Sequence, residues 1–371
     1  MVDSIFKDLL VLELASVLAG PSVGQFFAEL GAKVIKVENP LTHGDVTRSW
    51  KLKSESEDTE KPAYFCAANW GKISLALDLT QEQDLQQLYS LVEKADIVIA
   101  SYKPGDAEKL KVDYQTLQSI NTRLIYGHIT GYGPTDKRAG YDAVVQAESG
   151  FMYLNGDFNS LPTKMPVALM DILTAHQLKE GLLVALLQRE RTGKGELVQV
   201  SLLASGVSAL ANQATNYLVA GYEPQRMGSE HPNIVPYGKV FYTKDQKPLV
   251  LAVGDDRQFK KLCVTLGAPE LAEQPQFKTN YNRVQNREKL NKTLSELIRK
   301  QERVQFLEQL HEQRIPAGAV NSIPEVFELQ QAQEMLLRHP DTPPGVRQVA
   351  FRLEGQELPM PLAPPTFDQG L

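Results

Sequence analysis

The strongest constraint on the fold is an alternation of short β-rich runs and helical segments in the first 130 residues. The runs at 8–14 (DLLVLEL) and 33–38 (KVIKVE) flank a glycine-marked turn and the helix-like segment PSVGQFFAEL. Two strands joined by such a helix run parallel, and the crossover is nearly always right-handed. Similar patterns predict strands at 95–100 and 123–129 and helices at 81–94 and 106–119. We therefore expect an α/β fold with a parallel, Rossmann-like sheet.

The pattern changes after about residue 205. A long helical segment at 204–221 is followed by the proline-punctuated SEHPNIVPYG, a hairpin at 239–253 and three helices at about 256–267, 285–299 and 302–312. We expect a large domain over 1–205, a linker over 206–230 and a smaller α+β domain over 231–329. In the tail at 330–371, the residues 346–353 (VRQVAFRL) are expected to form a strand.

Several motifs of other enzyme classes do not occur. The turn after the first strand reads Ala-Gly-Pro-Ser at 19–22 and lacks the glycines of G-x-G-x-x-G, so a nicotinamide oxidoreductase is disfavoured. The chain contains no Walker A, G-x-S-x-G or H-E-x-x-H motif, and its six histidines are scattered. We expect no metal site.

Charge and hydropathy exclude further classes. The net charge of −6 gives no electrostatic case for nucleic acid, and no apolar run reaches the ~18 residues of a membrane span. The polar, acidic segment at 39–68 is typical of a mobile surface loop. With no basic and apolar leader pattern at the amino end, and with Cys66 and Cys263 far apart, we expect a cytoplasmic protein with reduced thiols.

Asp171 is the most informative single residue. It stands where the extended apolar stretch 167–170 gives way to a helical pattern. Backbone N–H groups at a helix start stabilise and hold a carboxylate, which suits a nucleophile. The same position suits an ordinary N-cap worth about 1 kcal/mol. The spacing alone leaves both interpretations open.

The residues after Asp171 form an ordered set of motifs: a helix of small and apolar residues, then RERTGKG at 189–195 and VQVSL at 198–202. Others precede it: LGAKVIKVE at 30–38, NWGK at 69–72, YKPG at 102–105 and GYGP at 131–134. This set resembles the class III CoA-transferases, the CaiB/BaiF or formyl-CoA transferase-like family, over nearly all of residues 5–205.

The resemblance implies an enzyme that moves CoA from an acyl-CoA thioester to a carboxylic acid acceptor, with Asp171 forming a covalent aspartyl intermediate. It also implies coenzyme A as substrate and product, and no tightly bound cofactor. A further implication is an interlocked homodimer in which the tail at 330–371 returns to complete the large domain. By position, the family's CoA and substrate contacts correspond here to Val17, Leu18, Ala19, Lys72, Ser101, Tyr102, Lys109 and Tyr141.

Three of these neighbourhoods depart from the family pattern. Leu18 stands where members that act on small diacids often have glutamine, which predicts a less polar acyl pocket. Asn39 replaces an arginine, and Ser101 replaces an asparagine. Lys72 and Lys109 also read as ordinary surface lysines, because most lysines are exposed.

Tyr141 distinguishes transfer from a related activity. The α-methylacyl-CoA racemases resemble the same motifs but carry histidine at this position, where it acts as an acid/base partner. A tyrosine keeps its proton near neutral pH and is a poor base. We therefore favour CoA transfer over racemisation, while a packing role for Tyr141 and a non-catalytic CoA-binding protein remain alternatives.

Overall fold

The computed structural model describes residues 4–340 and 342–370 and divides into two compact units. The first contains residues up to 151, then 164–222, and the chain from 333 onward; the second contains 152–163 and 223–332. This division differs from the expected one at three places. The linker expected over 206–230 is divided between the two units after residue 222, residues 152–163 belong to the second unit, and the tail joins the first unit from 333 and not from 330.

The first unit is built on six parallel strands in the order β3-β2-β1-β4-β5-β6. This confirms the predicted parallel sheet and is the strand order of a doubly wound Rossmann fold. The order reverses between β1 and β4, where a crevice opens at the carboxyl ends of the strands. The strands are β1 (Leu10–Leu14), β2 (Lys33–Glu38), β3 (Lys72–Ala76), β4 (Ile97–Ala100), β5 (Ile125–Thr130) and β6 (Leu197–Ser201).

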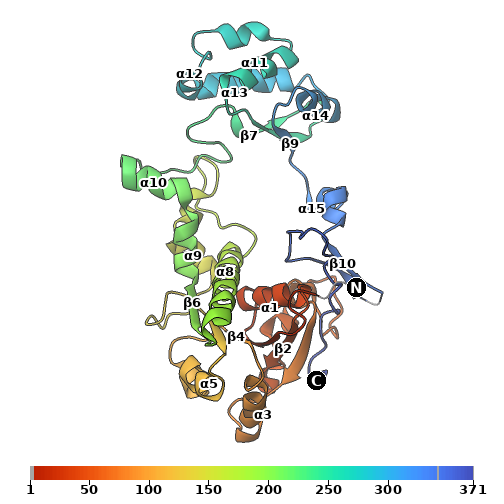
Figure 1. Cartoon of the computed structure of the whole chain (residues 1–371). Helices are drawn as coiled ribbons and strands as arrows, with labels where there is room; N and C mark the ends of the chain where they lie inside the picture. The colour runs from red at the N-terminus through yellow and green to blue at the C-terminus, as the bar shows by residue number, and fades with distance from the viewer. Residues whose placement is uncertain (1–3, 341, 371) are drawn as a thin grey trace. The chain divides into compact units, whose positions relative to one another are not determined.

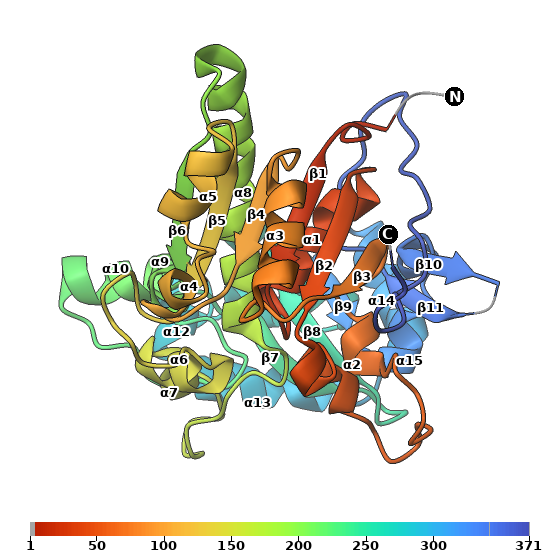
Figure 2. The same ribbon diagram turned by 90° about the horizontal axis from the view of Figure 1, so that it is seen from below.

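Helices cover both faces of the sheet because successive strand residues point to opposite sides. On one face Val11 packs in a core with α1 (Ala19–Glu29) and α8 (Leu169–Thr192). On the other, its neighbour Leu12 packs with α3 (Glu82–Val92) and α5 (Tyr114–Ile120). Both layers are visible in Figures 1 and 2.

The first unit also contains shorter elements. They are η1 (Pro40–Thr42), η2 (Val46–Ser49), α2 (Ala63–Cys66), α4 (Asp106–Lys109), α6 (Asp142–Glu148), α9 (Leu202–Ala209) and α10 (Ala211–Ala220). The chain passes from the first unit to the second within α7 (Phe151–Leu154). The segment 39–68, expected to be a mobile loop, contains three of these shorter elements and buries Thr47, Arg48 and Phe65. The helix expected over 204–221 is broken at Ala211, whose φ is +47°.

The carboxyl segment returns to the first unit, as expected. Antiparallel strands β10 (Leu336–His339) and β11 (Thr342–Val346) precede it. The strand expected at 346–353 is wrong, because regular structure ends at Val346. Instead, the Glu29 carboxylate accepts hydrogen bonds from the backbone N–H groups of Gln348 (2.8 Å) and Val349 (3.1 Å).

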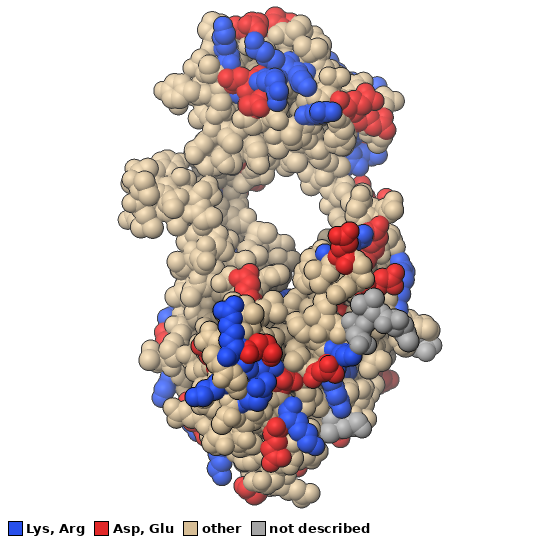
Figure 3. Space-filling view, viewed as in Figure 1, with Lys and Arg blue, Asp and Glu red and all other residues tan. Residues whose placement is uncertain are grey.

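The second unit contains the antiparallel sheet β7-β8-β9, in which β7 and β8 form the predicted hairpin. Its elements are β7 (Tyr237–Tyr242), β8 (Pro248–Ala252), α11 (Asp256–Thr265), η3 (Pro269–Glu273), α12 (Asn280–Gln285), α13 (Arg287–Ile298), α14 (Arg303–Glu312), β9 (Ala317–Ala319), α15 (Ile323–Val326) and α16 (Gln330–Gln333). On the face drawn in Figure 3, basic and acidic side chains are interspersed. No helix among the described residues is long and apolar enough to cross a membrane.

Candidate active site

Asp171 lies where two pockets of the first unit meet. One pocket has a volume of about 420 Å³ and the other about 650 Å³, and Asp171 lines both. It is the third residue of α8, whose N-cap residue is Ala168 and makes no side-chain hydrogen bond to the helix. Instead, Asp142 accepts the backbone N–H of Met170 (2.8 Å) from 28 residues away. The N-cap interpretation of Asp171 is therefore wrong, and its carboxylate is free for chemistry.

The environment disfavours the charge on Asp171. Burial, and to a smaller extent the negative charge of Asp142, raise the pKa of its carboxyl from 3.8 to about 7. Asp142 itself is held in place, since its second oxygen accepts a hydrogen bond from Gln146 Nε2 (2.8 Å). A carboxylate with little stabilisation in the ground state is a stronger nucleophile than a salt-bridged one.

The turn between β1 and α1 forms the opposite wall. Val17 has a φ of +72°, a left-handed conformation that a β-branched residue adopts only when its surroundings impose it. Its N–H donates to both carboxylate oxygens of Asp45 at 3.2 Å. Leu18 and Ala19 follow at the start of α1, and all three line the smaller pocket. This turn therefore lines the same pocket as Asp171.

A buried ionic cluster of Glu13, Lys36, Asp45 and Lys72 holds this turn in place. The ammonium of Lys36 lies 2.9 Å from Glu13 and 2.8 Å from Asp45, and Lys72 lies 2.7 Å from the other oxygen of Glu13. Burial alone would raise the pKa of Asp45, but Lys36 and hydrogen bonds from Thr47 hold it at about 2. The negative charges around Lys36 outweigh its burial and raise its pKa. For Lys72, burial outweighs the charge of Glu13 and lowers the pKa of the ammonium to about 8.

The cluster lies directly against the α1 backbone. A Cβ atom at Gly24 would lie 1.9 Å from Oε2 of Glu13 and 3.2 Å from Cε of Lys72. Because that buried pair has no room to move, only glycine fits at this point of α1. The ion pairs therefore determine how closely α1 packs against the sheet, and this in turn positions the turn at Val17.

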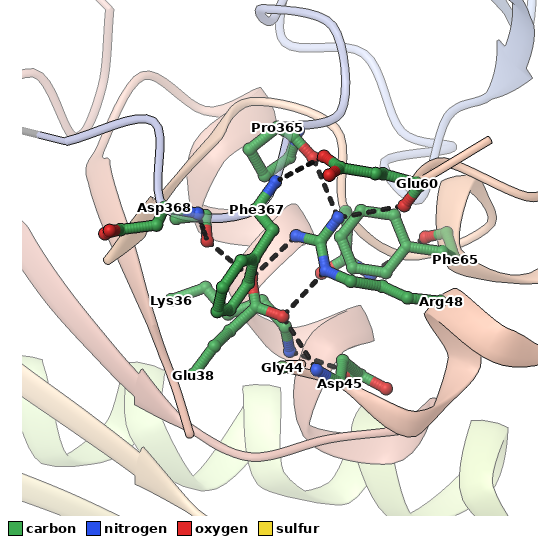
Figure 4. Close-up of polar contacts among 12 residues, drawn as sticks. Lys36, Glu38, Gly44, Asp45, Arg48, Glu60, Phe65, Pro365, Phe367 and Asp368 are labelled. Atoms are coloured by element: carbon green, nitrogen blue, oxygen red, sulfur yellow. Dashed lines mark hydrogen bonds and ion pairs between the residues drawn. The ribbon is translucent and has the colours of Figure 1, made fainter. Parts of the chain in front are cut away.

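Figure 4 shows a second set of contacts that joins Asp45 to the carboxyl tail. Arg48 forms a bidentate pair with Glu38 (2.6 and 2.9 Å) and donates to the carbonyl of Pro365 (3.2 Å). Glu38 in turn accepts the backbone N–H of Asp45 (2.7 Å). The guanidinium of Arg48 also stacks on the ring of Phe65, with its Cζ 3.9 Å from the ring centroid. The tail is thereby connected to the residue that holds Val17.

The two lysines predicted to contact CoA, Lys72 and Lys109, lie in different environments. Lys72 has no exposed surface, and its Nζ is enclosed by Glu13, Asn69 and the carbonyl of Pro21. An ammonium enclosed in this way has no free face for a phosphate, so Lys72 supports α1 instead. Lys109 is exposed, pairs with Asp106 at 2.7 Å, and lines none of the pockets described.

The other predicted residues gather around Asp171. Ser101 and Tyr102 follow β4 and line the smaller pocket together with Val17, Leu18, Ala19 and Asp171. Burial raises the pKa of Tyr102 to about 12, so its hydroxyl stays protonated. Tyr141 is 70% exposed, precedes α6 and lines both pockets. Because its side chain is exposed, Tyr141 does not pack in the hydrophobic core.

Four further pocket residues were not predicted. Trp50 and Tyr64 stack edge to face at 4.9 Å, and both line the larger pocket with His176 and Lys179. The two aromatic residues come from the segment that composition marked as a loop. His176 and Lys179 lie in α8, five and eight residues after Asp171. Neither is at the three- or four-residue spacing that makes direct neighbours on a helix, so the sequence did not single them out.

Comparison with known proteins agrees with this geometry. The model of CoA-transferase family III matches residues 6–370. The chain belongs to CoA-transferase family III. It is 40% identical over 334 residues to the succinate–glutarate CoA-transferase of Agrobacterium fabrum, covering 88% of this chain and 83% of that protein. It is also 35% identical to the mouse succinyl-CoA:glutarate CoA-transferase, covering 94% and 82%.

Solved structures of the family have the same fold. A crystal structure of a CaiB/BaiF family protein from Brucella suis superposes with a TM-score of 0.85 at 39% identity, covering 97% of this chain and 96% of that one. Together these findings confirm the predicted family and the predicted activity, transfer of CoA from an acyl-CoA to an acid.

Proposed function

We propose that the family III reaction proceeds in this protein through a covalent intermediate on Asp171. The observation that carries the proposal is a carboxylate without a hydrogen bond or ion pair to any described residue, at the junction of two pockets. A merely structural buried carboxylate is paired, as Asp45 and Glu13 are here.

Each step exchanges one bond for another. An oxygen of Asp171 attacks the thioester carbonyl, the C–S bond breaks, and a mixed anhydride and CoA thiolate result. The thiolate attacks the aspartyl carbonyl, which releases the first acid and leaves an aspartyl-CoA thioester. The acceptor carboxylate attacks this thioester and expels the thiolate. Attack of the thiolate on the new acyl group regenerates Asp171.

An oxyanion forms at every attack and needs hydrogen-bond donors. The first turn of α1 supplies candidates, because the leading N–H groups of a helix have no intrahelical partner and carry partial positive charge. Val17 cannot contribute, since its N–H is bound by Asp45. We therefore assign this role to the backbone of Leu18 and Ala19, which line the pocket with Asp171.

CoA is proposed to enter across the carboxyl ends of the strands. A third pocket of about 250 Å³ lies there, lined by ends of β1, β2 and β4, at the position where doubly wound sheets bind nucleotides. Ser101 and Tyr102 line both this pocket and the one with Asp171, so the pantetheine arm would pass them. The exposed Lys109 is the proposed phosphate contact, and Lys109→Met should then raise KM for acyl-CoA and leave kcat unchanged.

We also propose a cytoplasmic homodimer whose subunits interlock. In the single chain, α10 has no buried residue, and Leu218 and Val219 are 76% and 84% exposed. A second subunit would remove this apolar surface from water. Sedimentation of a monomer at micromolar concentration would exclude it.

The test of the intermediate is chemical trapping. Incubation with an acyl-CoA followed by hydroxylamine should convert the carboxyl of Asp171 to a hydroxamate, detected by mass spectrometry of its peptide. Asp171→Asn should show neither modification nor transfer, while Asp142→Asn keeps the trapped product. Transfer by a folded Asp171→Asn protein would overturn the mechanism.

A further inference from the structure

Lys179 is a buried cation of the larger pocket that the mechanism above does not use. The residue is 5% exposed, yet its ammonium makes no hydrogen bond or ion pair with any residue described in the structure. Its nearest interactions are the ring of Phe26, 5.3 Å away, and the charge of Glu29 beyond ion-pair distance. A lysine this deep normally has a partner, because burying an unpaired charge is costly.

Its place relative to the nucleophile is defined by the helix. Asp171, Ala175 and Lys179 follow one another at four-residue spacing along α8, and all three line the larger pocket. Such residues are neighbours on a helix surface. The small side chain of Ala175 leaves open space between the carboxylate and the ammonium.

The spacing fits a short acyl chain. Eight residues of α-helix rise about 12 Å, and the long Lys179 side chain leans back toward the helix start and shortens the gap. An acyl group on Asp171 that lies over Ala175 would bring an atom about four to six carbons away to the ammonium.

We propose that Lys179 binds the second carboxylate of a dicarboxylic acid whose first carboxylate reacts at Asp171, so that the enzyme acts on short diacids. This inference rests on the proposed function and adds the substrate class. The unpaired ammonium of Lys179 supplies the positive charge. Trp50 and Tyr64 line the same pocket, where the carbon chain of the diacid would lie. Leu18 and Lys179 both line this pocket, and the less polar acyl pocket predicted from Leu18 stays a prediction.

Charge balance around the ammonium supports this role. The negative charge of Glu29 acts on it, but both oxygens of that carboxylate accept other hydrogen bonds, one from Gln25 and Gln348 and the other from Val349. Burial lowers the pKa of Lys179 to about 8, so the group is still mostly protonated at neutral pH. A substrate carboxylate would complete its coordination and favour the charged form.

The test is identity exchange with matched acids. The protein is incubated with glutaryl-CoA and isotopically labelled glutarate, and in parallel with pentanoyl-CoA and labelled pentanoate, which differ only in the terminal carboxylate. Label entering the thioester is measured by mass spectrometry. The parent should exchange the diacid with a higher kcat/KM than the monoacid.

Lys179→Met should lower diacid exchange at least tenfold, the range of a lost charge-assisted hydrogen bond. Monoacid exchange should stay within about twofold, and Lys179→Arg should restore part of the preference. Lys194→Met, an exposed lysine just beyond the end of α8, is the matched control and should change neither rate.

The outcomes separate the two proposals. Equal losses for both acids in Lys179→Met, or a parent that prefers pentanoate, would overturn the diacid assignment and leave the Asp171 mechanism standing. Trapping of Asp171 in a parent protein that exchanges glutarate and pentanoate equally well would also overturn the diacid assignment alone. No exchange with any acid of a wider panel, together with no trapped Asp171, would overturn the proposed function itself.

Discussion

Two groups of buried charged residues lie within the first unit of this protein, and they differ in whether they have ion-pair partners. Under α1, Glu13, Lys36 and Asp45 satisfy one another, and the pKa of Asp45 is held at about 2. Along α8, Asp171 and Lys179 have no ion-pair partner among the described residues; the pKa of the first is raised to about 7 and that of the second lowered to about 8. Paired charges hold the backbone, and unpaired ones remain available to substrate.

The largest expected effect comes from breaking the paired group. Lys36→Met leaves the charge of Asp45 buried without its main partner, so the free energy of unfolding should fall by about 3–5 kcal/mol. Urea denaturation measures it, and Lys33→Met, an exposed position on the same strand, should change it by less than about 0.5 kcal/mol. A loss below about 1 kcal/mol in Lys36→Met would show that the cluster does not hold the fold.

An intermediate effect separates the two carboxylates by their pH dependence. The folded pKa of Asp45 lies below the usual 3.8, so its contribution of about 2 kcal/mol is present above pH 4 and is lost as the pH falls toward 2. The folded pKa of Asp171 lies above 3.8, so ionisation of Asp171 destabilises the fold as the pH rises from about 4 to 7.

Replacing each with asparagine should therefore act in opposite directions. At pH 8, Asp45→Asn should be less stable than the parent, and Asp171→Asn at least as stable. Thermal unfolding scans from pH 4 to pH 8 provide the measurement. The comparison fails if both variants lose stability equally at pH 8.

The sequence predicted what depends on local pattern. Strand periodicity gave the parallel sheet, and the motif around Asp171 gave the position of the proposed nucleophile. It could not show that Asp142 caps α8, because that contact joins residues 28 positions apart. Nor could it show that Lys72 is buried, since burial depends on how β3 packs against α1. Lysines are mostly exposed, so Lys179 gave no signal before its helix was placed against the sheet.

The smallest effect concerns the charge that remains beside the nucleophile. Attack requires ionised Asp171, so the rate of adduct formation in the free enzyme should rise with pH through its pKa of about 7. Asp142→Asn removes the neighbouring negative charge but keeps an oxygen for the Met170 N–H. Because burial is the larger cause of the raised pKa, the midpoint should move to lower pH by less than about one unit.

Single-turnover trapping of Asp171 at a series of pH values measures this midpoint, and Asp8→Asn, an exposed carboxyl in the same unit, should leave it in place. A midpoint that moves upward in Asp142→Asn would mean that Asp142 stabilises the charge on Asp171. The nucleophile would then belong with the paired charges under α1, and the distinction between the two groups would not hold.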